Sequence, residues 1–542
     1  MSKLTRVTLM LAVLFAFDKA LALLRQVIIA RQFGLSPELD AFNAANNLPD
    51  LLFALISGGT LAVAFIPVLT ATLSQDGRNS SWLLFSRIAN LAFLVTALVS
   101  VIFALLADQL VGWELGIAPG FNTEQQVVVI RLMRLNLIAT LIFSISGLVM
   151  AGLQANQHFL LPALAPILYN TGQIFGAMVL APSQGYQISG FTLPAAGLGV
   201  DGLVYGVILG AVLHLLIQLP GLIKFKFHWT PSLGLKDSAV QRVLALLGPR
   251  VLTMLLIQLI FIVRDNLASR LEAGAVTALA YGWMIQQVPE TLIGTAIGTA
   301  LLPTLAEFVS RGEKEKFRQN IQNAVNILIG ITVPVAVILG IGLQPFFPTV
   351  FGFDEQGSQL LMWVTRGYLL GLTGHCLLEV ASRAFYAQQN ARIPLFAAMV
   401  NIFLYVTVGR LLFKPLGAAG ISLTDAIAFT SQAVFLLIML ASQDKAWFSK
   451  LFGVLKFSQW KKTANPPAQP SGYNFSVTIS PVNVLLRSAL AGVIAALLTY
   501  GCMLFSNRLG LHPVISASIS MLLGALAAFP FVLREVKTLL RL

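Results

Sequence analysis

Two pairs of arginines stand inside apolar segments of this chain, and both pairs have the same internal spacing. Arg25 and Arg31 bracket five residues, and so do Arg264 and Arg270. The same 239 residues separate the corresponding members of the two pairs. A positive charge at the centre of a bilayer costs about 2.5–3.5 kcal/mol on insertion scales, so such residues usually serve a function. The spacing therefore predicts a duplicated helical membrane domain with cations in both copies.

Further charges accompany the first arginine of each pair. Asp18 and Arg25 share one helical face, and Lys19 lies one position round from it. Arg264 is followed by Asp265 in a segment that is otherwise almost wholly apolar. We predict a cationic cavity between the halves, formed by Arg25, Arg264, Lys19 and Asp18, that receives an anionic group. The alternative is internal ion pairing that only holds helices together.

The second members of the two pairs are interpreted differently. Arg31 and Arg270 lie near helix ends, where long side chains reach the membrane interface. A third charged group, His375, Glu379 and Arg383, shares one helical face at a spacing of four. A proton or cation relay is one interpretation of this group. An internal His-Glu-Arg network is the other and is favoured.

The sequence holds no recognisable catalytic motif. It lacks a metal-spaced Cys/His cluster, a Walker-type Gly-Lys-Ser/Thr loop and a serine beside a plausible His-acid pair. We therefore predict a transporter and not an enzyme, with no metal and no cofactor. Without an ATP loop, the energy must come from the membrane potential or from a gradient of a monovalent cation.

Composition places the chain in the membrane. Hydrophobic residues make up 57% of the 542 residues, charged residues 11%, and mean hydropathy is +0.82. A helix of about twenty apolar residues crosses a hydrocarbon core of about 30 Å. The sequence predicts an all-α polytopic protein with about fourteen transmembrane helices. Their approximate bounds are 6–33, 40–73, 83–107, 126–153, 159–181, 197–221, 243–270, 275–309, 321–345, 358–387, 393–413, 418–442, 483–506 and 512–536.

Loop charges predict the orientation of these helices. The loops 222–242, 310–320 and 443–482 are basic, whereas the alternate loops 108–125 and 182–196 hold no Lys or Arg. By the positive-inside rule, both termini and the basic loops are predicted to be cytoplasmic. The formal charge of +13 is scattered among these short loops, so nucleic acid is not the expected partner.

The repeat predicts the domain organisation. We expect two six-helix bundles related by a parallel repeat, followed by two extra helices. The predicted segments are an N-terminal bundle at 1–221, a basic cytoplasmic connection at 222–242, a C-terminal bundle at 243–442, a cytoplasmic linker at 443–482 and a two-helix unit at 483–542.

Proline and glycine interrupt the second and eighth predicted spans at matching places. Proline removes a backbone donor and kinks a helix, and glycine lowers the cost of bending. We predict hinges there, although a single glycine equally permits close helix packing. The predicted hinge residues are Pro49, Gly58, Gly59, Pro289 and Gly294.

The start of the second span is unusually polar. It contains Asp40, Asn43, Asn46, Asn47 and Asp50 within eleven residues. These side chains fit either the mouth of a transport pathway or the polar groups that begin a helix around a bend. The sequence alone leaves both interpretations open.

Several strings in the chain resemble the MurJ/MviN family of lipid II flippases. These strings are Arg25-Gln26-Val27-Ile28-Ile29-Ala30-Arg31-Gln32-Phe33-Gly34, Asp40-Ala41-Phe42, Leu48-Pro49, Ala64-Phe65-Ile66-Pro67, Ala118-Pro119-Gly120-Phe121, Pro162-Ala163-Leu164-Ala165-Pro166 with Asn170, Arg383-Ala384-Phe385-Tyr386-Ala387 and Arg392-Ile393-Pro394. The resemblance covers the first twelve spans, and the extra helix pair also matches the family's plan.

The resemblance implies two six-helix bundles around a cationic cavity, within the superfamily that also holds multidrug and polysaccharide exporters. It implies alternating-access transfer of the undecaprenyl-pyrophosphate-linked peptidoglycan precursor, lipid II, to the outer leaflet for cell wall synthesis. Arg25 matches the cavity arginine of the first span. The implied partners are the lipid-linked glycan, membrane lipids and the cell wall synthesis machinery.

The chain also departs from the family pattern. Phe53 and Ala54 replace the arginines usual in the second span, and Met284 replaces an arginine of the eighth. Arg264 and Asp265 stand in the reverse of the usual acid and cation order. These departures keep an alternative open, which is an ion-coupled exporter of another lipid-linked glycan or of drugs on the same scaffold.

Overall fold

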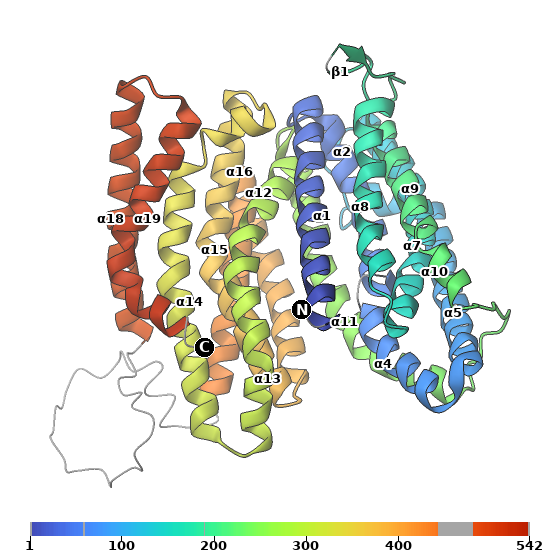
Figure 1. Cartoon of the computed structure of the whole chain (residues 1–542). Coiled ribbons are helices and arrows are strands. Elements are labelled where there is room, and N and C mark those ends of the chain that lie inside the picture. Colours follow the sequence, from blue (N-terminus) through green and yellow to red (C-terminus); the bar gives the residue numbers. More distant parts are fainter. Residues whose placement is uncertain (1–2, 58–59, 189, 443–480, 540–542) are drawn as a thin grey trace, which may run out of the picture. The chain divides into compact units, whose positions relative to one another are not determined.

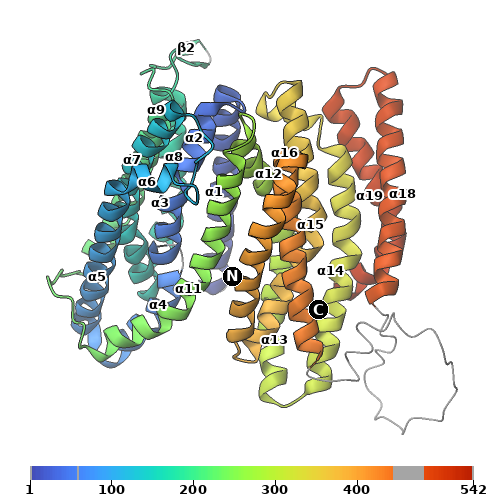
Figure 2. The same ribbon diagram turned by 180° about the vertical axis from the view of Figure 1, so that it is seen from behind.

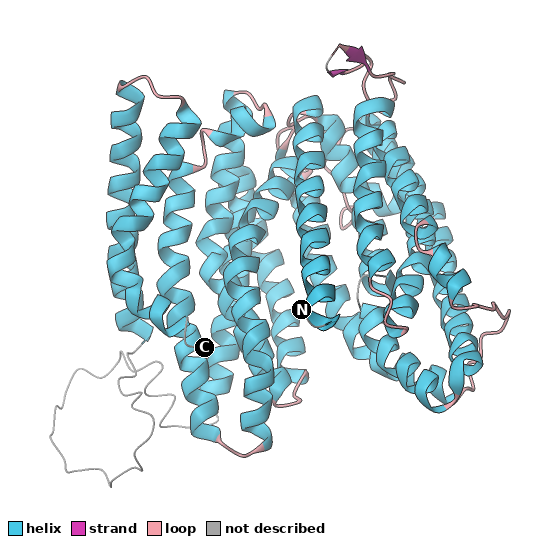
Figure 3. Ribbon diagram, in the orientation of Figure 1, coloured by secondary structure: helices cyan, strands magenta, loops and turns pink. Residues whose placement is uncertain are grey.

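A computed structural model describes residues 3–57, 60–188, 190–442 and 481–539. Those residues are almost entirely helical, as the cyan ribbon in Figure 3 shows. Their only strands are β1 (Gln187–Ile188) and β2 (Phe191–Thr192), which form a short antiparallel hairpin. The predicted all-α membrane fold is confirmed.

The chain divides into two compact units. The first comprises Met1–Ala278 and Val350–Gly357, and the second comprises Leu279–Thr349 and Ser358–Leu542. The first unit therefore includes α11, although α11 opens the second copy of the predicted repeat. Within the first unit, α11 packs against α3, α4, α5 and the π-helix η1. The predicted division at 222–242 remains a prediction about the sequence repeat.

The first unit is a bundle of helices with one exposed hairpin (Figure 1). Its elements are α1 (Lys3–Phe33), α2 (Pro37–Ala45), α3 (Asn47–Leu52), η1 (Phe53–Ser57), α4 (Thr60–Gln75), α5 (Gly77–Leu105), α6 (Ala107–Gly112), α7 (Thr123–Ala155), α8 (Leu160–Phe175), η2 (Gly176–Leu180), β1, β2, α9 (Val200–Leu216), α10 (Leu219–Lys224) and α11 (Ser238–Ala268). The start of α12 also belongs to it.

The second unit is helical throughout its described residues. Its elements are α12 (Ala275–Glu290), η3 (Thr291–Thr295), α13 (Ala296–Ser310), α14 (Lys314–Gly342), η4 (Phe347–Phe351), α15 (Glu355–Ala387), α16 (Arg392–Ala441), α18 (Pro481–Arg508) and α19 (Pro513–Leu539). The helices α18 and α19 pack on each other and on α14, which the two opposite views in Figures 1 and 2 show. The predicted linker 443–482 lies almost wholly outside the described residues.

The helices correspond to the predicted spans. Among the described residues, ten helical segments are long and apolar enough to cross a membrane. One of them, α16, contains two predicted spans, because Gly417 breaks its helical geometry with a φ of 58° two residues after Pro415. The charged α1, the interrupted α2–α4 and α15 account for the remaining predicted spans.

A row of glycines allows α8 and α9 to approach closely. A Cβ atom on Gly172 would lie 2.5 Å from the Cα of Gly210, and one on Gly176 would lie 2.6 Å from the Cα of Gly206. Larger residues would hold the two backbones apart. This small-xxx-small packing is the usual way for membrane helices to associate without a hydrophobic driving force.

Both predicted hinge regions contain a π-helical turn. In the first unit η1 follows α3, which contains Pro49, and in the second unit η3 directly follows Pro289 and Glu290. The two turns begin 238 residues apart, close to the 239 residues that separate the two arginine pairs. Such π-turns are often found at functional sites. Gly294 lies in η3, where a Cβ would contact Cys376 at 2.8 Å, so close packing also requires a glycine there. Gly58 and Gly59 lie outside the described residues.

Candidate functional site

The first unit contains a cavity of about 560 Å³ between α1, α2, α3, α7, α8 and α9. Its lining mixes one cation, one acid, several amides and several aromatic rings. The lining residues are Arg25, Gln26, Ile29, Phe42, Asn43, Asn46, Pro49, Asp50, Phe53, Asn136, Ala139, Thr140, Phe143, Met150, Pro166, Tyr169, Gln173, Val207 and His214.

Arg25 is held in this cavity by an amide and not by an acid. Its Nη1 donates a hydrogen bond of 2.9 Å to Oδ1 of Asn170 on α8. Nδ2 of Asn170 in turn donates to Oδ1 of Asp18 at 2.8 Å. Within the described residues Arg25 makes no ion pair, and its buried Nε has no hydrogen-bond acceptor. The guanidinium is therefore oriented, while its charge is left for a ligand to neutralise.

Asn170 is a site residue that the charge pattern did not identify. It lies on α8, 145 residues from Arg25, with about 5% of its surface exposed. The predicted helical face of Asp18 and Arg25 is therefore the face toward α8, and the amide bridges the two charges. The sequence signals for Asn170 are its polar side chain within an apolar span and its place beside the family-like string of residues 162–166.

The opposite wall is polar and aromatic. Nδ2 of Asn136 on α7 donates to Oδ1 of Asn46 at 2.6 Å. The ring of Phe143 packs edge-on against Phe53 and Tyr169, with both pairs of ring centroids 5.1 Å apart. Phe53, which stands where the family pattern has an arginine, thus contributes an aromatic wall. The cavity gains apolar surface at this point.

A single acid, Asp50 on α3, also lines the cavity. Its side chain is exposed, and it makes no ion pair within the described residues. The cavity therefore contains both a positive and a negative side chain. Arg25 is oriented by Asn170, and Asp50 is accessible to solvent or ligand. The acid predicted for the cavity was Asp18, whereas the acid in the described lining is Asp50.

Arg264, the second predicted cavity cation, does not line this cavity. Its Nε donates to Oδ1 of the adjacent Asp265 at 2.7 Å, and its guanidinium lies 5.1 Å from the ring centroid of Phe261. The other oxygen of Asp265 accepts a 2.7 Å hydrogen bond from Asn47. The long arginine side chain curls back to its neighbour, so this buried charge is already paired. Within the first unit, Arg25 and Arg264 are not brought into one cavity.

Lys19, the third predicted cation, lies on an exposed face of α1. Its neighbours on that face, Phe15 and Leu23, are also more than half exposed. Lys19 is not among the residues that line the cavity. Its contact with an anionic ligand stays a prediction.

The polar start of the second span serves two purposes. Asp40 is 1% exposed and accepts hydrogen bonds from the backbone N–H groups of Gly274 and Thr277, at 2.6 and 2.7 Å. It therefore caps the start of α12 from a distant helix. Asn43 donates to the Thr277 hydroxyl at 3.0 Å and also lines the cavity. The polar segment thus contributes to a helix start on another segment and to the cavity lining, and its role as the mouth of a transport pathway stays a prediction.

Replacing Asp40 with alanine is expected to lower the free energy of unfolding by about 2–3 kcal/mol, because two buried N–H groups lose a charged acceptor. Asp76 offers a matched control, since it occupies the N-cap position of α5 without accepting a side-chain hydrogen bond. Thermal unfolding of purified Asp40→Ala and Asp76→Ala in detergent measures the difference. Equal transition temperatures for the two variants would contradict the capping role.

Comparison with known proteins identifies the family. The family model described as "Lipid II flippase MurJ" matches residues 29–464. The chain belongs to the lipid II flippase MurJ family. It is 28% identical over 450 residues to the lipid II flippase MurJ of Burkholderia cenocepacia, covering 81% of this chain and 84% of that protein. A probable lipid II flippase MurJ of Treponema pallidum is 27% identical over 451 residues, covering 81% and 82%.

Solved structures agree on the fold. A lipid II flippase MurJ in an inward closed conformation matches with a TM-score of 0.74 and 19% identity, covering 98% of this chain and all of that one. An inward-facing multidrug resistance MATE family transporter of the MOP superfamily matches with a TM-score of 0.65 and 15% identity, covering 81% and 98%. The MATE match ends short of full coverage of this chain, whereas the MurJ match extends over nearly all of it.

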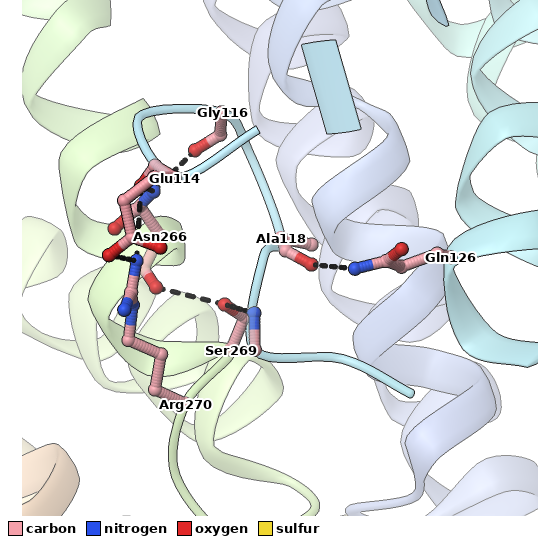
Figure 4. Close-up of polar contacts among 8 residues, drawn as sticks. Glu114, Gly116, Ala118, Gln126, Asn266, Ser269 and Arg270 are labelled. Atoms are coloured by element: carbon pink, nitrogen blue, oxygen red, sulfur yellow. Dashed lines mark hydrogen bonds and ion pairs between the residues drawn. The ribbon is translucent and has the colours of Figure 1, made fainter. Parts of the chain in front are cut away.

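In this MurJ family member, a loop of residues 113–122 docks on the end of α11 (Figure 4). Nδ2 of Asn266 donates to the backbone carbonyls of Glu114 and Gly116, at 3.0 and 2.6 Å. Arg270 donates to the same Glu114 carbonyl and pairs with the Glu114 carboxylate at 2.8 Å. Arg270 therefore anchors the loop, which is a structural role near a helix end.

Two further contacts complete the docked loop. The backbone N–H of Gly120 donates to the Ser269 hydroxyl at 3.1 Å, and Gln126 donates to the carbonyl of Ala118, also at 3.1 Å (Figure 4). A Cβ on Gly120 would lie 2.5 Å from the Cα of Arg270. Only glycine fits at this approach.

The predicted relay in the second unit divides into two separate groups. Glu379 and Arg383 form an ion pair with each other along α15. His375 instead bonds across to another helix, with its Nε2 2.8 Å from Oδ2 of Asp425 on α16. Its Nδ1 lies 3.9 Å from Oε1 of Glu290 on α12. The predicted His-Glu-Arg network is therefore wrong for His375, whose partners come from α12 and α16, and its role in an ion relay stays a prediction.

Proposed function

We propose that this chain moves lipid II from the cytoplasmic to the outer leaflet of the bacterial inner membrane, for cell wall synthesis. Membership of the lipid II flippase MurJ family supports this substrate. The observation on this chain that supports it is Arg25, a half-buried arginine that is oriented by Asn170 but makes no ion pair in a cavity of the first unit. Such a group attracts an anion, and lipid II carries a pyrophosphate.

The cavity offers different chemistry to different parts of such a substrate. At about 4 Å and an effective dielectric constant near 20, one arginine–phosphate charge pair contributes roughly 4 kcal/mol before desolvation. Amides such as Asn136 and Asn46 supply donors and acceptors for sugar hydroxyls, and the ring of Tyr169 supplies a flat apolar surface. The prenyl tail stays in the lipid.

The driving energy is proposed to include the membrane potential. A potential negative inside favours outward movement of an anion by about 2.3 kcal/mol per charge per 100 mV. Both termini are proposed to be cytoplasmic, as the positive charge of the connecting loops indicates. The π-helical turns η1 and η3 are proposed as the points at which the two units change shape.

Complementation tests this function. Bacterial cells depleted of their own lipid II flippase are supplied with this chain, and outer-leaflet lipid II is measured by extracellular labelling. We expect growth and labelled lipid II to be restored. The control is a multidrug MATE exporter expressed at the same level, which should restore neither. Well-folded chain in the membrane without any rescue would favour export of another lipid-linked glycan.

A further inference from the structure

The second unit contains a buried group of ionisable residues that the proposed substrate cavity does not use. It consists of His375 on α15, Asp425 on α16 and Glu290 on α12. The side chains of His375 and Asp425 are 3% and 5% exposed, and that of Glu290 is 15% exposed. We define these three residues as the histidine–acid cluster.

Without a bound proton, the histidine–acid cluster carries an excess of negative charge. Within the described residues, neither Asp425 nor Glu290 pairs with a lysine or arginine, because the nearby Arg383 is taken by Glu379. With a neutral imidazole the cluster holds two carboxylates and no cation. Burying uncompensated charge is costly. One proton on the imidazole, shared with the two acids, offsets one of the two negative charges.

A second buried histidine, His214, has neutral partners instead of carboxylates. His214 in the first unit is hydrogen-bonded to the hydroxyl of Ser146 at 2.6 Å and lies beside Gln218, both of which are neutral. Neither of these partners carries a charge that would favour the protonated ring. His375, in contrast, has a carboxylate facing each ring nitrogen, at 2.8 Å and 3.9 Å. Carboxylates on both sides select the protonated ring.

The cluster also joins three helices at a deformable place. The His375 ring stacks on Phe429 of α16 with centroids 4.3 Å apart, and packs edge-on against Trp283 of α12 at 5.3 Å. Glu290 is the last residue before the π-helical turn η3. With the proton bound, the imidazolium attracts the acids of α12 and α16. Without it, those two acids repel each other beside the π-helical turn η3.

We propose that the histidine–acid cluster is a proton-binding site whose occupancy couples a proton gradient to the transport cycle. Its ligand is one proton, held by His375 and shared with Asp425 and Glu290. The groups that face it are Glu290 from α12, Asp425 from α16, and the Glu379–Arg383 pair from its own helix. The proposal that proton binding is coupled to transport rests on the proposed function, whereas the proposal that the cluster binds a proton does not.

Proton binding is tested on the purified full chain labelled with ¹⁵N-histidine. The imidazole signal that disappears in His375→Gln is followed between about pH 5 and about pH 8, the range in which histidines change charge. We expect this signal to titrate in the wild type and to change its pH dependence in Asp425→Asn. A His375 signal that keeps one protonation state throughout would overturn the proposal, whether or not lipid II is transported.

Coupling is tested in proteoliposomes with the membrane potential held at zero. One coupled proton shifts the distribution of lipid II between leaflets by about tenfold per pH unit of gradient. We expect this shift in the wild type and in His512→Gln, whose exposed histidine lies in the loop between α18 and α19. His375→Gln and Asp425→Asn should equilibrate lipid II without responding to the gradient.

The remaining outcomes separate the two proposals. A wild type that responds to a sodium gradient and not to pH would overturn the proton assignment. A wild type that moves no lipid II under any gradient would count against the proposed function, and the histidine titration would then decide the proton site alone. A gradient response that survives in both cluster variants would overturn the coupling role.

Discussion

Cells that depend on this chain are expected to lose nearly all outward lipid II movement when Arg25 is replaced by alanine. Loss of one charge pair with a pyrophosphate, worth about 2–4 kcal/mol after desolvation, corresponds to a roughly 30- to 1,000-fold fall in transport. Extracellular labelling of lipid II and growth of the depleted strain measure this loss. Immunoblotting of membranes shows that the variant is present.

Three further variants make this result specific. Arg25→Lys keeps the charge but loses the forked geometry that meets Asn170, so intermediate transport is expected. Asp50→Asn removes the acid of the same cavity and should strengthen, not weaken, binding of an anionic headgroup. Arg131→Ala removes an exposed arginine paired with Asp201 and should leave transport unchanged. Equal transport by Arg25→Ala and Arg131→Ala would refute the cavity role of Arg25.

Replacing Gly206 with leucine is expected to destabilise the folded first unit strongly. A Cβ at this position would lie 2.7 Å from the Cα of Gly176, so the added side chain has to push α8 away from α9. Overpacking against backbone is expected to cost about 3 kcal/mol or more. Because α8 carries Asn170 and Tyr169, the same displacement disturbs the cavity.

Thermal unfolding in detergent measures this effect, with Gly501→Leu as the matched control. Gly501 lies within α18, and a Cβ there would meet nothing within 4 Å. Leucine is also the better helix former, so Gly501→Leu should keep or raise the transition temperature. If Gly206→Leu unfolds at the wild-type temperature, the close approach of α8 and α9 does not support the fold.

The apolar runs and the positions of proline and glycine predicted the helices well. A membrane span has to form all its backbone hydrogen bonds within one helix, so each span is seen in the sequence as one apolar run. The matching breaks after Pro49 and Pro289 were also predictable, and both contain π-helical turns. The division into compact units was not, since the packing of α11 with the first unit depends on contacts between distant segments. Nothing in the repeat itself encodes those contacts.

The candidate site was predicted only in part. Arg25 was predicted to line a cavity between the halves, and it lines a cavity within the first unit, because an unpaired charge in an apolar span needs a polar environment. Its partner Asn170 and the partner of His375, Asp425, lie far away in sequence, so the local helical spacing could not reveal them. Spacing favoured the local partner Glu379, which is occupied by Arg383. The pairing of Arg264 with its own neighbour shows why a repeated cation need not be a repeated function.

The contacts of the docked loop of residues 113–122 constrain the sequence of the loop less than they constrain the sequence at the end of α11. The side chains of Asn266 and Arg270 reach mainly for carbonyl oxygens of the loop, and every residue type provides a carbonyl. The exposed positions of the loop can therefore accept many substitutions during evolution, whereas Gly116, Gly120 and the end of α11 cannot.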